Sequence, residues 1–147
     1  MLRKILGVIV GVVAGVLTVS VLKMIGHHLV PPPPELIAAL AEADRARADE
    51  LIAQLPFAAF AMVLLAYLMG AFVATFTAAK IGREPRLTWL VGGIELAFVL
   101  ANIVLIPHPA WFVAAAILAT AIATIAGWKL SGGRLRGHGG IGRAASA

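Results

Sequence analysis

The stretch LTWLVGGIELAFVLANIVLI, from Leu87 to Ile106, decides the fold class of this chain. About 20 predominantly apolar residues are enough for one α-helix to cross the hydrocarbon core of a bilayer. The only charged side chain within the stretch is Glu95. A carboxyl group at that depth is costly unless it is protonated, paired or in contact with water, so it is a functional hypothesis by default. The stretch therefore predicts a membrane span with a candidate functional acid near its middle.

The composition of the whole chain agrees with a membrane protein. Hydrophobic residues make up 61% of the sequence, whereas soluble domains contain about 45–50% apolar residues. The chain contains four apolar segments of span length, at residues 5–25, 56–79, 87–106 and 111–130. We therefore predict an all-α fold, in which residues 1–130 form one integral membrane four-helix bundle. Because the sequence lacks cysteine, disulfides and thiolate metal sites are excluded.

The distribution of charge predicts how the bundle is oriented in the membrane. Cytoplasmic loops of membrane proteins are enriched in Lys and Arg. Basic residues precede the first span, lie between the second and third, and follow the fourth: Arg3, Lys4, Lys80, Arg83, Arg86, Lys129, Arg134, Arg136 and Arg143. The first connection is richer in acids, and the third connection has no Lys or Arg. Both termini are predicted to be cytoplasmic, in a bacterial inner membrane.

The connection after the first span predicts a helix outside the membrane. Pro31–Pro34 cannot continue a helix and end the first span. Residues 35–55 are rich in Ala, Leu, Glu and Arg, which are strong helix formers. We expect one helical connector there, which either lies on the membrane surface or runs on into the second span. Pro56 marks the entry point of that span.

The C-terminal residues 131–147 predict a flexible basic tail. This segment contains six glycines and three arginines. Such a composition favours a flexible chain, and the arginines favour weak contact with anionic lipid headgroups. The tail has no aromatic residue, so a nucleic-acid partner is not expected.

Small residues recur at helical spacing in all four spans. Gly7, Gly11 and Gly15 follow one another at intervals of four residues, which lets another helix backbone approach closely. The motif does not say whether that helix belongs to the same chain or to a second copy, so in-bundle packing and a homo-oligomer contact both stay open. The small residues predicted to serve helix packing in the other spans are Gly70, Ala74, Ala78, Gly92, Gly93, Ala119, Ala123 and Gly127. Because small residues gather at the predicted inner ends, the bundle is expected to be tighter inside and looser outside, which suits an outward-facing cavity.

Matching residues by depth predicts a polar cluster around Glu95. At 1.5 Å per residue, Tyr67 and Thr120 lie at about the depth of Glu95, and Thr18 is similarly placed. Asn102 follows two helical turns after Glu95, on nearly the same face. Glu95 is expected to be protonated, because burial disfavours the charged form of a carboxyl group. The cluster is interpreted either as interhelical glue or as part of a transport route.

Polar residues at the outer end of the first span suggest little further chemistry. Lys23 is close enough to the outer interface for its ammonium to snorkel there. His27 and His28 lie beside it, and His108 is on the same side of the membrane. A zinc site needs three or four converging ligands, so no metal is predicted and these histidines are weak candidates only.

Signatures of enzymes are absent from the sequence. It contains no HExxH, GxSxG or P-loop motif, so we expect no catalytic residues and no cofactor. The first interpretation is a non-enzymatic membrane protein, a small oligomer or an accessory subunit of a larger membrane complex, which packs through its glycine and alanine faces. The alternative is a proton-coupled transporter or channel for a small molecule or ion that uses Glu95, with Asn102 along the route.

Two segments carry a family resemblance. GHHLVPPPP after the first span and ANIVLIPHPAWF between the third and fourth spans resemble segments of small uncharacterised bacterial membrane proteins with four spans. The resemblance covers most of the chain and implies the topology without an activity. The four-span multidrug transporters are similar in size and also have one membrane acid, but theirs lies in the first helix, which has no acid here.

Overall fold

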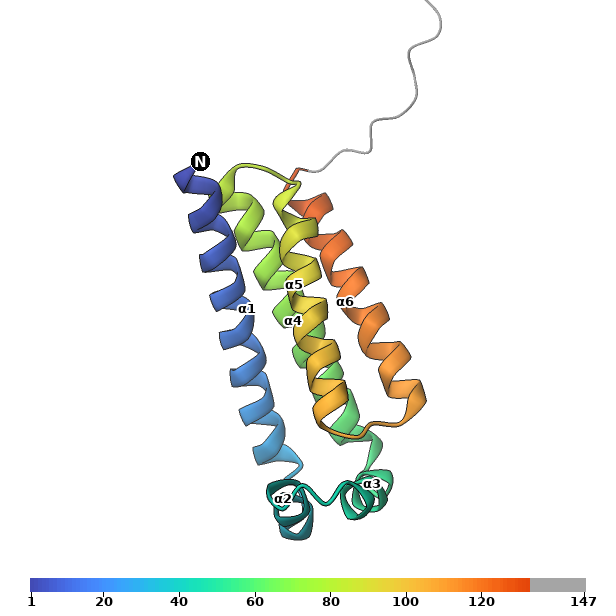
Figure 1. Ribbon diagram of the computed structural model, residues 1–147. Coiled ribbons are helices and arrows are strands. Elements are labelled where there is room, and N and C mark those ends of the chain that lie inside the picture. Colours follow the sequence, from blue (N-terminus) through green and yellow to red (C-terminus); the bar gives the residue numbers. More distant parts are fainter. Residues whose placement is uncertain (133–147) are drawn as a thin grey trace, which may run out of the picture.

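The structure is a computed structural model that describes residues 1–132. Four long helices, α1 (Leu2–Leu29), α4 (Phe57–Gly82), α5 (Leu87–Leu105) and α6 (Ala110–Leu130), lie side by side. Two short helices, α2 (Pro34–Ala41) and α3 (Arg45–Ala53), lie across one end of this bundle (Figure 1). All four long helices are apolar and long enough to cross a membrane, and the predicted all-α bundle is confirmed. The predicted basic tail lies almost wholly outside the described residues.

The connector differs from the single helix expected over residues 35–55. It is broken between α2 and α3, where Ala43 has a positive φ of 56°. The second helix starts there because Asp44 caps it: the Asp44 carboxylate accepts the backbone N–H of Arg47 at 3.1 Å. The connector does not run on into α4, since Pro56 has an extended backbone and forms the N-cap of that helix.

Helix α4 lies at the centre of the packing. It contacts α1, α5 and α6, whereas α1 packs mainly along α4 and only slightly against α5. The glycine face of α1 meets α4 at close range: a Cβ atom at Gly7 would lie 2.8 Å from the Ala78 carbonyl oxygen, and one at Gly11 would lie 2.6 Å from that of Ala74. The sequence left open whether this face packs within the bundle or against a second copy of the chain. In the structure, it packs against α4 of the same chain.

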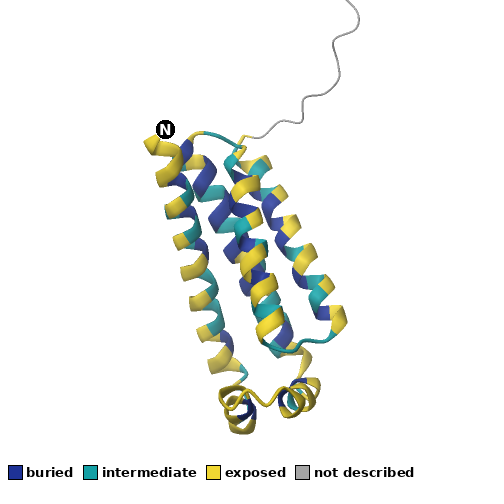
Figure 2. Cartoon of the chain, in the orientation of Figure 1, coloured by how far each residue is buried: buried dark blue, intermediate teal, exposed yellow. Residues whose placement is uncertain are grey.

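Most other glycines of the spans also lie against a neighbouring helix. Gly70 faces Val19 of α1, Gly92 faces Thr124 of α6, and Gly127 faces Thr75 of α4. Gly93 is different, because a Cβ atom there would meet nothing within 4 Å. Figure 2 shows the result, in which buried residues line the inner sides of the long helices and exposed residues cover their outer sides. Among the alanines predicted to serve packing, Ala74, Ala78 and Ala123 are buried, and Ala119 is half-buried.

The end of the bundle opposite α2 and α3 is held by charged groups. The Lys4 ammonium pairs with the Glu84 carboxylate, and Arg3 Nε donates to the Ile81 carbonyl oxygen at 2.7 Å. The hydrogen bond from Lys4 and its charge lower the pKa of Glu84. These contacts fasten the start of α1 to the last turn of α4 and to the turn that follows it.

Candidate functional site

The two short helices form an amphipathic cap over one end of the bundle. Leu36 and Ala39 of α2 and Ala48 and Ile52 of α3 are each at most 5% exposed. They belong to an apolar cluster that continues into the spans through Phe60, Tyr67, Val99, Phe112 and Ala116. The acidic side chains of the cap, Glu35, Glu42, Asp44, Asp49 and Glu50, are exposed. The cap therefore presents its apolar face to the spans and its charges to the surroundings.

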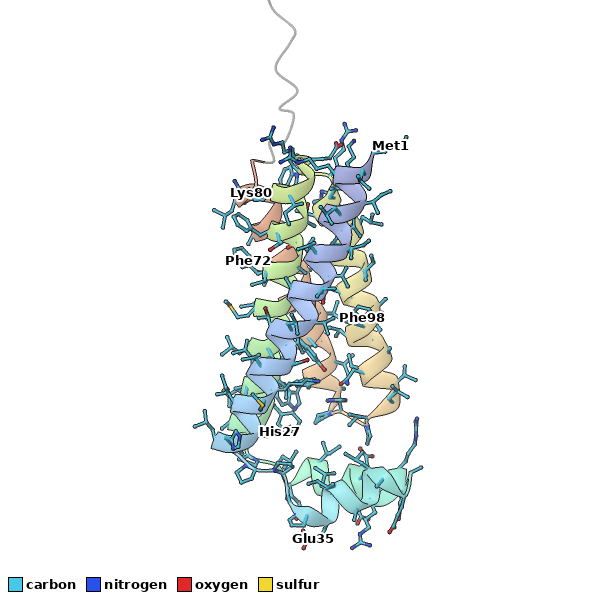
Figure 3. The ribbon with its side chains drawn as sticks, turned by 90° about the vertical axis from the view of Figure 1, so that its left-hand side faces the viewer. Met1, His27, Glu35, Phe72, Lys80 and Phe98 are labelled. Carbon is cyan, nitrogen blue, oxygen red and sulfur yellow. The ribbon has the colours of Figure 1, made fainter. Side chains whose placement is uncertain are left out.

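A cavity of about 340 Å³ lies beneath this cap. Its walls come from every helix of the described chain and are mostly apolar. The polar residues that line it are Lys23, His27, Asn102 and His108. In Figure 3, His27 lies at the end of α1 next to the cap, whereas Met1 and Lys80 lie at the opposite end of the bundle. The cavity thus occupies the half of the bundle in which the sequence has fewer small residues.

The cavity residue Asn102 is held by a hydrogen bond from Tyr67, which does not itself line the cavity. The Tyr67 hydroxyl donates to Asn102 Oδ1 at 2.7 Å, which joins α4 to α5. Lys23 Nζ lies 5.1 Å from the centroid of the Tyr67 ring, within the range of a cation–π interaction. Snorkelling of Lys23 to the membrane interface stays a prediction, and in the structure the Lys23 side chain lines the cavity beneath the cap. Its ammonium lies over the Tyr67 ring of the neighbouring helix α4.

His108 lies in the turn between α5 and α6 and also lines the cavity. Its Nδ1 is 2.6 Å from the Ile106 carbonyl oxygen, and its ring stacks on Phe112 with centroids 4.7 Å apart. Burial lowers the pKa of His108, and the nearby charge of Lys23 lowers it further, against the opposing effect of the bond to Ile106. His108 is therefore neutral at neutral pH, with Nδ1 as the donor to Ile106 and Nε2 as an acceptor.

Glu95 lies apart from the pair formed by Tyr67 and Asn102. It is 4% exposed, and its Oε1 is buried without a hydrogen-bond partner in the part of the chain that the structure describes. That oxygen faces α1 at Gly15, where a Cβ atom would lie only 2.6 Å away. The carboxyl group is thus buried against a glycine of the neighbouring helix.

The predicted hydrogen bonds between Glu95 and the threonines are not formed. Thr18 donates instead to the Ala14 carbonyl oxygen at 2.8 Å, and Thr120 donates to that of Ala116 at 2.9 Å. A threonine hydroxyl in a helix can reach the carbonyl oxygen of the preceding turn. It therefore forms its hydrogen bond within its own helix. The predicted cluster therefore divides into Tyr67 bonded to the cavity residue Asn102, Glu95 alone, and two locally bonded threonines.

The three histidines that were weak candidates for metal ligands do not all line the cavity. His27 and His108 line the cavity, while His28 is exposed and does not line it. Within residues 1–132, no three side chains of His, Cys, Asp or Glu converge in a way that would hold a metal ion.

Reasoning from the sequence anticipated a cavity in the looser half of the bundle and found several of its residues, but it did not predict that the connector covers this cavity. The composition of residues 35–55 predicted a helical connector outside the membrane, but it did not identify the surface that this connector covers. Lys23 was expected to reach the membrane surface, and the structure adds that it provides the cationic group of the cavity. An arrangement of apolar walls with a few converging polar groups is typical of a small-molecule site. Comparisons with protein-family models, with curated proteins and with solved structures found no match to this chain.

Proposed function

We propose that this chain is a non-enzymatic membrane protein that binds a small amphipathic molecule beneath the cap of α2 and α3. The observation that carries this proposal is the cavity itself, about 340 Å³ in volume, with apolar walls and four polar lining residues. Ligand pockets measure about 300–1,000 Å³ and combine apolar walls with a few polar groups that orient the ligand. Binding of an amphiphile would bury its apolar part on these walls and satisfy the polar groups.

The proposal includes an orientation in the bacterial inner membrane. The end of the bundle that holds Arg3, Lys4 and Lys80 is basic, whereas the exposed face of the cap is acidic. The positive-inside rule then favours cytoplasmic termini and a cavity near the outer face of the membrane.

Blocking the cavity tests whether it binds a ligand. Ala59 lines the cavity, while its neighbour Ala58 is exposed and does not. We expect Ala59→Trp to reduce saturable binding of radiolabelled dodecanoate or dodecanol by at least about tenfold, because the indole occupies the space of the ligand. The protein is assayed in phosphatidylcholine nanodiscs, with empty nanodiscs subtracted. Ala58→Trp is the matched control and is expected to bind as the wild type does. If the wild type binds neither compound saturably, or if Ala59→Trp binds both as well as the control, the proposed function is wrong.

A second candidate function is proton-coupled transport of the bound molecule. It is supported by the buried Oε1 of Glu95, which lacks a partner in residues 1–132, and by the position of Glu95 two helical turns inward from the cavity residue Asn102. Glu95→Gln keeps the shape of the side chain and removes the exchangeable proton. The variant is expected to fold normally and to lose pH-dependent uptake of dodecanoate into liposomes. Uptake equal to that of the wild type would exclude Glu95 as the coupling group.

Assembly with a partner, either a second copy or a larger membrane complex, stays a separate proposal. The sequence suggested assembly through the glycine-containing faces of the helices. In the structure, however, the glycine face of α1 lies against α4 of the same chain. A partner would therefore have to use another surface of the bundle. Native mass spectrometry of the protein ejected directly from membranes distinguishes a monomer, a homo-oligomer and a complex with another protein.

A further inference from the structure

We infer that the ligand of the cavity is a single-chain amphiphile with an anionic head group, and that the head group pairs with Lys23. This inference rests on the proposed function and adds the chemical class of the ligand. It follows from the charge of the cavity, from its hydrogen-bond donors and from its size.

The cavity contains a cation without an acidic partner. Lys23 is half-buried, and the one salt bridge among residues 1–132 joins Lys4 to Glu84 at the other end of the bundle. The titratable residues that line the cavity are Lys23, His27 and His108, all of them basic. Glu95, the one acidic residue of the spans, is not among the lining residues. A charge in such a partly apolar site attracts an opposite charge more strongly than it would in water.

The other polar groups of the wall also offer donors. The Tyr67 hydroxyl donates to Asn102 Oδ1, and within residues 1–132 both hydrogens of the Asn102 amide nitrogen are left for a ligand. The Lys23 ammonium supplies up to three donors, which can reach an acceptor while the ammonium stays near the Tyr67 ring. A carboxylate or phosphate oxygen accepts hydrogen bonds from such groups, and bonds that involve an ionised partner are stronger than neutral ones.

The apolar walls and the volume of the cavity indicate what the apolar part of the ligand is. The apolar side chains that line the cavity come from the cap and from the spans, and they include Leu36, Leu40, Ile52, Phe60 and Phe112. A volume of about 340 Å³ lies at the lower end of the range for ligand pockets, about 300–1,000 Å³. The cavity therefore suits one apolar chain better than the two chains of an ordinary phospholipid. An anionic head group with one chain occurs both in free fatty acids and in lysophospholipids with a phosphate head.

The inference is tested by comparing an acid with its neutral analogue. Wild-type protein in phosphatidylcholine nanodiscs is expected to bind radiolabelled dodecanoate more tightly than dodecanol at neutral pH. Lys23→Met is expected to weaken dodecanoate binding by roughly tenfold or more, because a hydrogen bond to a charged group is lost. Binding of dodecanol, which carries no charge, is expected to weaken by a smaller factor than binding of dodecanoate, because bonds between neutral and charged groups are weaker than those between opposite charges. Lys23→Arg keeps the charge and is expected to keep the preference for the acid.

The chain offers a matched control for Lys23. Lys80 Nζ also lies over an aromatic ring, 5.3 Å from the centroid of Phe76, but it lies at the opposite end of the bundle and does not line the cavity. Lys80→Met removes the same charge and is expected to leave dodecanoate binding unchanged. Competition with unlabelled hexadecanoate and with lysophosphatidate then identifies the preferred head group as a carboxylate, a phosphate or either one.

Two results would overturn the inference. One is a wild type that binds dodecanol as tightly as dodecanoate, and the other is Lys23→Met protein that retains wild-type affinity for the acid. In both cases, loss of binding in Ala59→Trp but not in Ala58→Trp would leave the proposed function intact. Failure of the Ala59→Trp experiment would reject the proposed function itself.

Discussion

His108 connects the turn between α5 and α6 to the cavity through its imidazole ring. Burial lowers its pKa below the ordinary value of 6.5, so the folded state binds a proton less readily than the unfolded chain does. The stability that the neutral ring provides is therefore fully present above pH 6.5 and is lost as the pH falls through the lowered pKa. We expect the melting temperature of the wild type to fall when the pH is lowered below 6.5. His108→Gln should flatten this dependence, and an equal pH dependence in both proteins would contradict the prediction.

Gly11 is a residue at which a single added methyl group should disturb the packing of α1 against α4. A Cβ atom there would lie 2.6 Å from the Ala74 carbonyl oxygen and 2.8 Å from the Ala78 Cβ, so α1 and α4 would have to separate. Overpacking of this kind costs about 1–3 kcal/mol. We expect Gly11→Ala to lower the melting temperature in detergent.

Gly93 provides the control for that substitution. It is also a glycine in the middle of a span, but a Cβ atom there meets nothing within 4 Å. Gly93→Ala should therefore leave the melting temperature unchanged or raise it slightly, since alanine favours a helix more than glycine does. Equal destabilisation by both substitutions would show that the contact between α1 and α4 is not the cause.

At the scale of elements, the cap is held to the bundle mainly by side chains. Its apolar residues join the core of the spans, and the Arg45 guanidinium donates to the Val104 carbonyl oxygen at 3.0 Å. Val104 belongs to the last turn of α5, where carbonyl groups lack partners within the helix. The hydrogen bond therefore satisfies the end of one element and fixes the position of another.

Removing this bond should loosen the cap without unfolding the spans. A typical hydrogen bond contributes about 0.5–1.5 kcal/mol, so Arg45→Ala is expected to speed amide hydrogen exchange across α2 and α3 by up to roughly tenfold. Arg47→Ala is the control, because the Arg47 guanidinium makes no hydrogen bond within residues 1–132. Unchanged exchange in Arg45→Ala would show that the apolar contacts alone hold the cap.

At the scale of the whole molecule, the proposed orientation is directly testable. The chain has no cysteine, so single substitutions can be labelled without a background. Glu35 lies in the cap and Lys80 lies at the opposite end of the bundle. A membrane-impermeant maleimide added to intact spheroplasts should label Glu35→Cys, whereas Lys80→Cys should react only after permeabilisation. The reverse pattern would place the cavity at the cytoplasmic face.

The spans and their approximate ends were predictable from the sequence because they depend on local properties. The expected span at residues 87–106 differs from α5 (Leu87–Leu105) by one residue at its end, since apolar length and the following proline are both visible in the sequence. The break in the connector was missed. It depends on the αL backbone of Ala43 and on the Asp44 cap, both of which compete with the strong helix propensity of that segment.

By itself, the sequence determined an all-α protein with four helices apolar enough to cross a membrane, together with one buried acid and a face of small residues on α1. Only the tertiary structure decided which groups meet. It placed α4 against the glycines of α1, directed Lys23 over Tyr67, and left Glu95 without the predicted hydroxyl partners. The physical reason is that depth along a helix follows from residue number, whereas the rotation of one helix against another depends on side-chain packing between segments far apart in the chain.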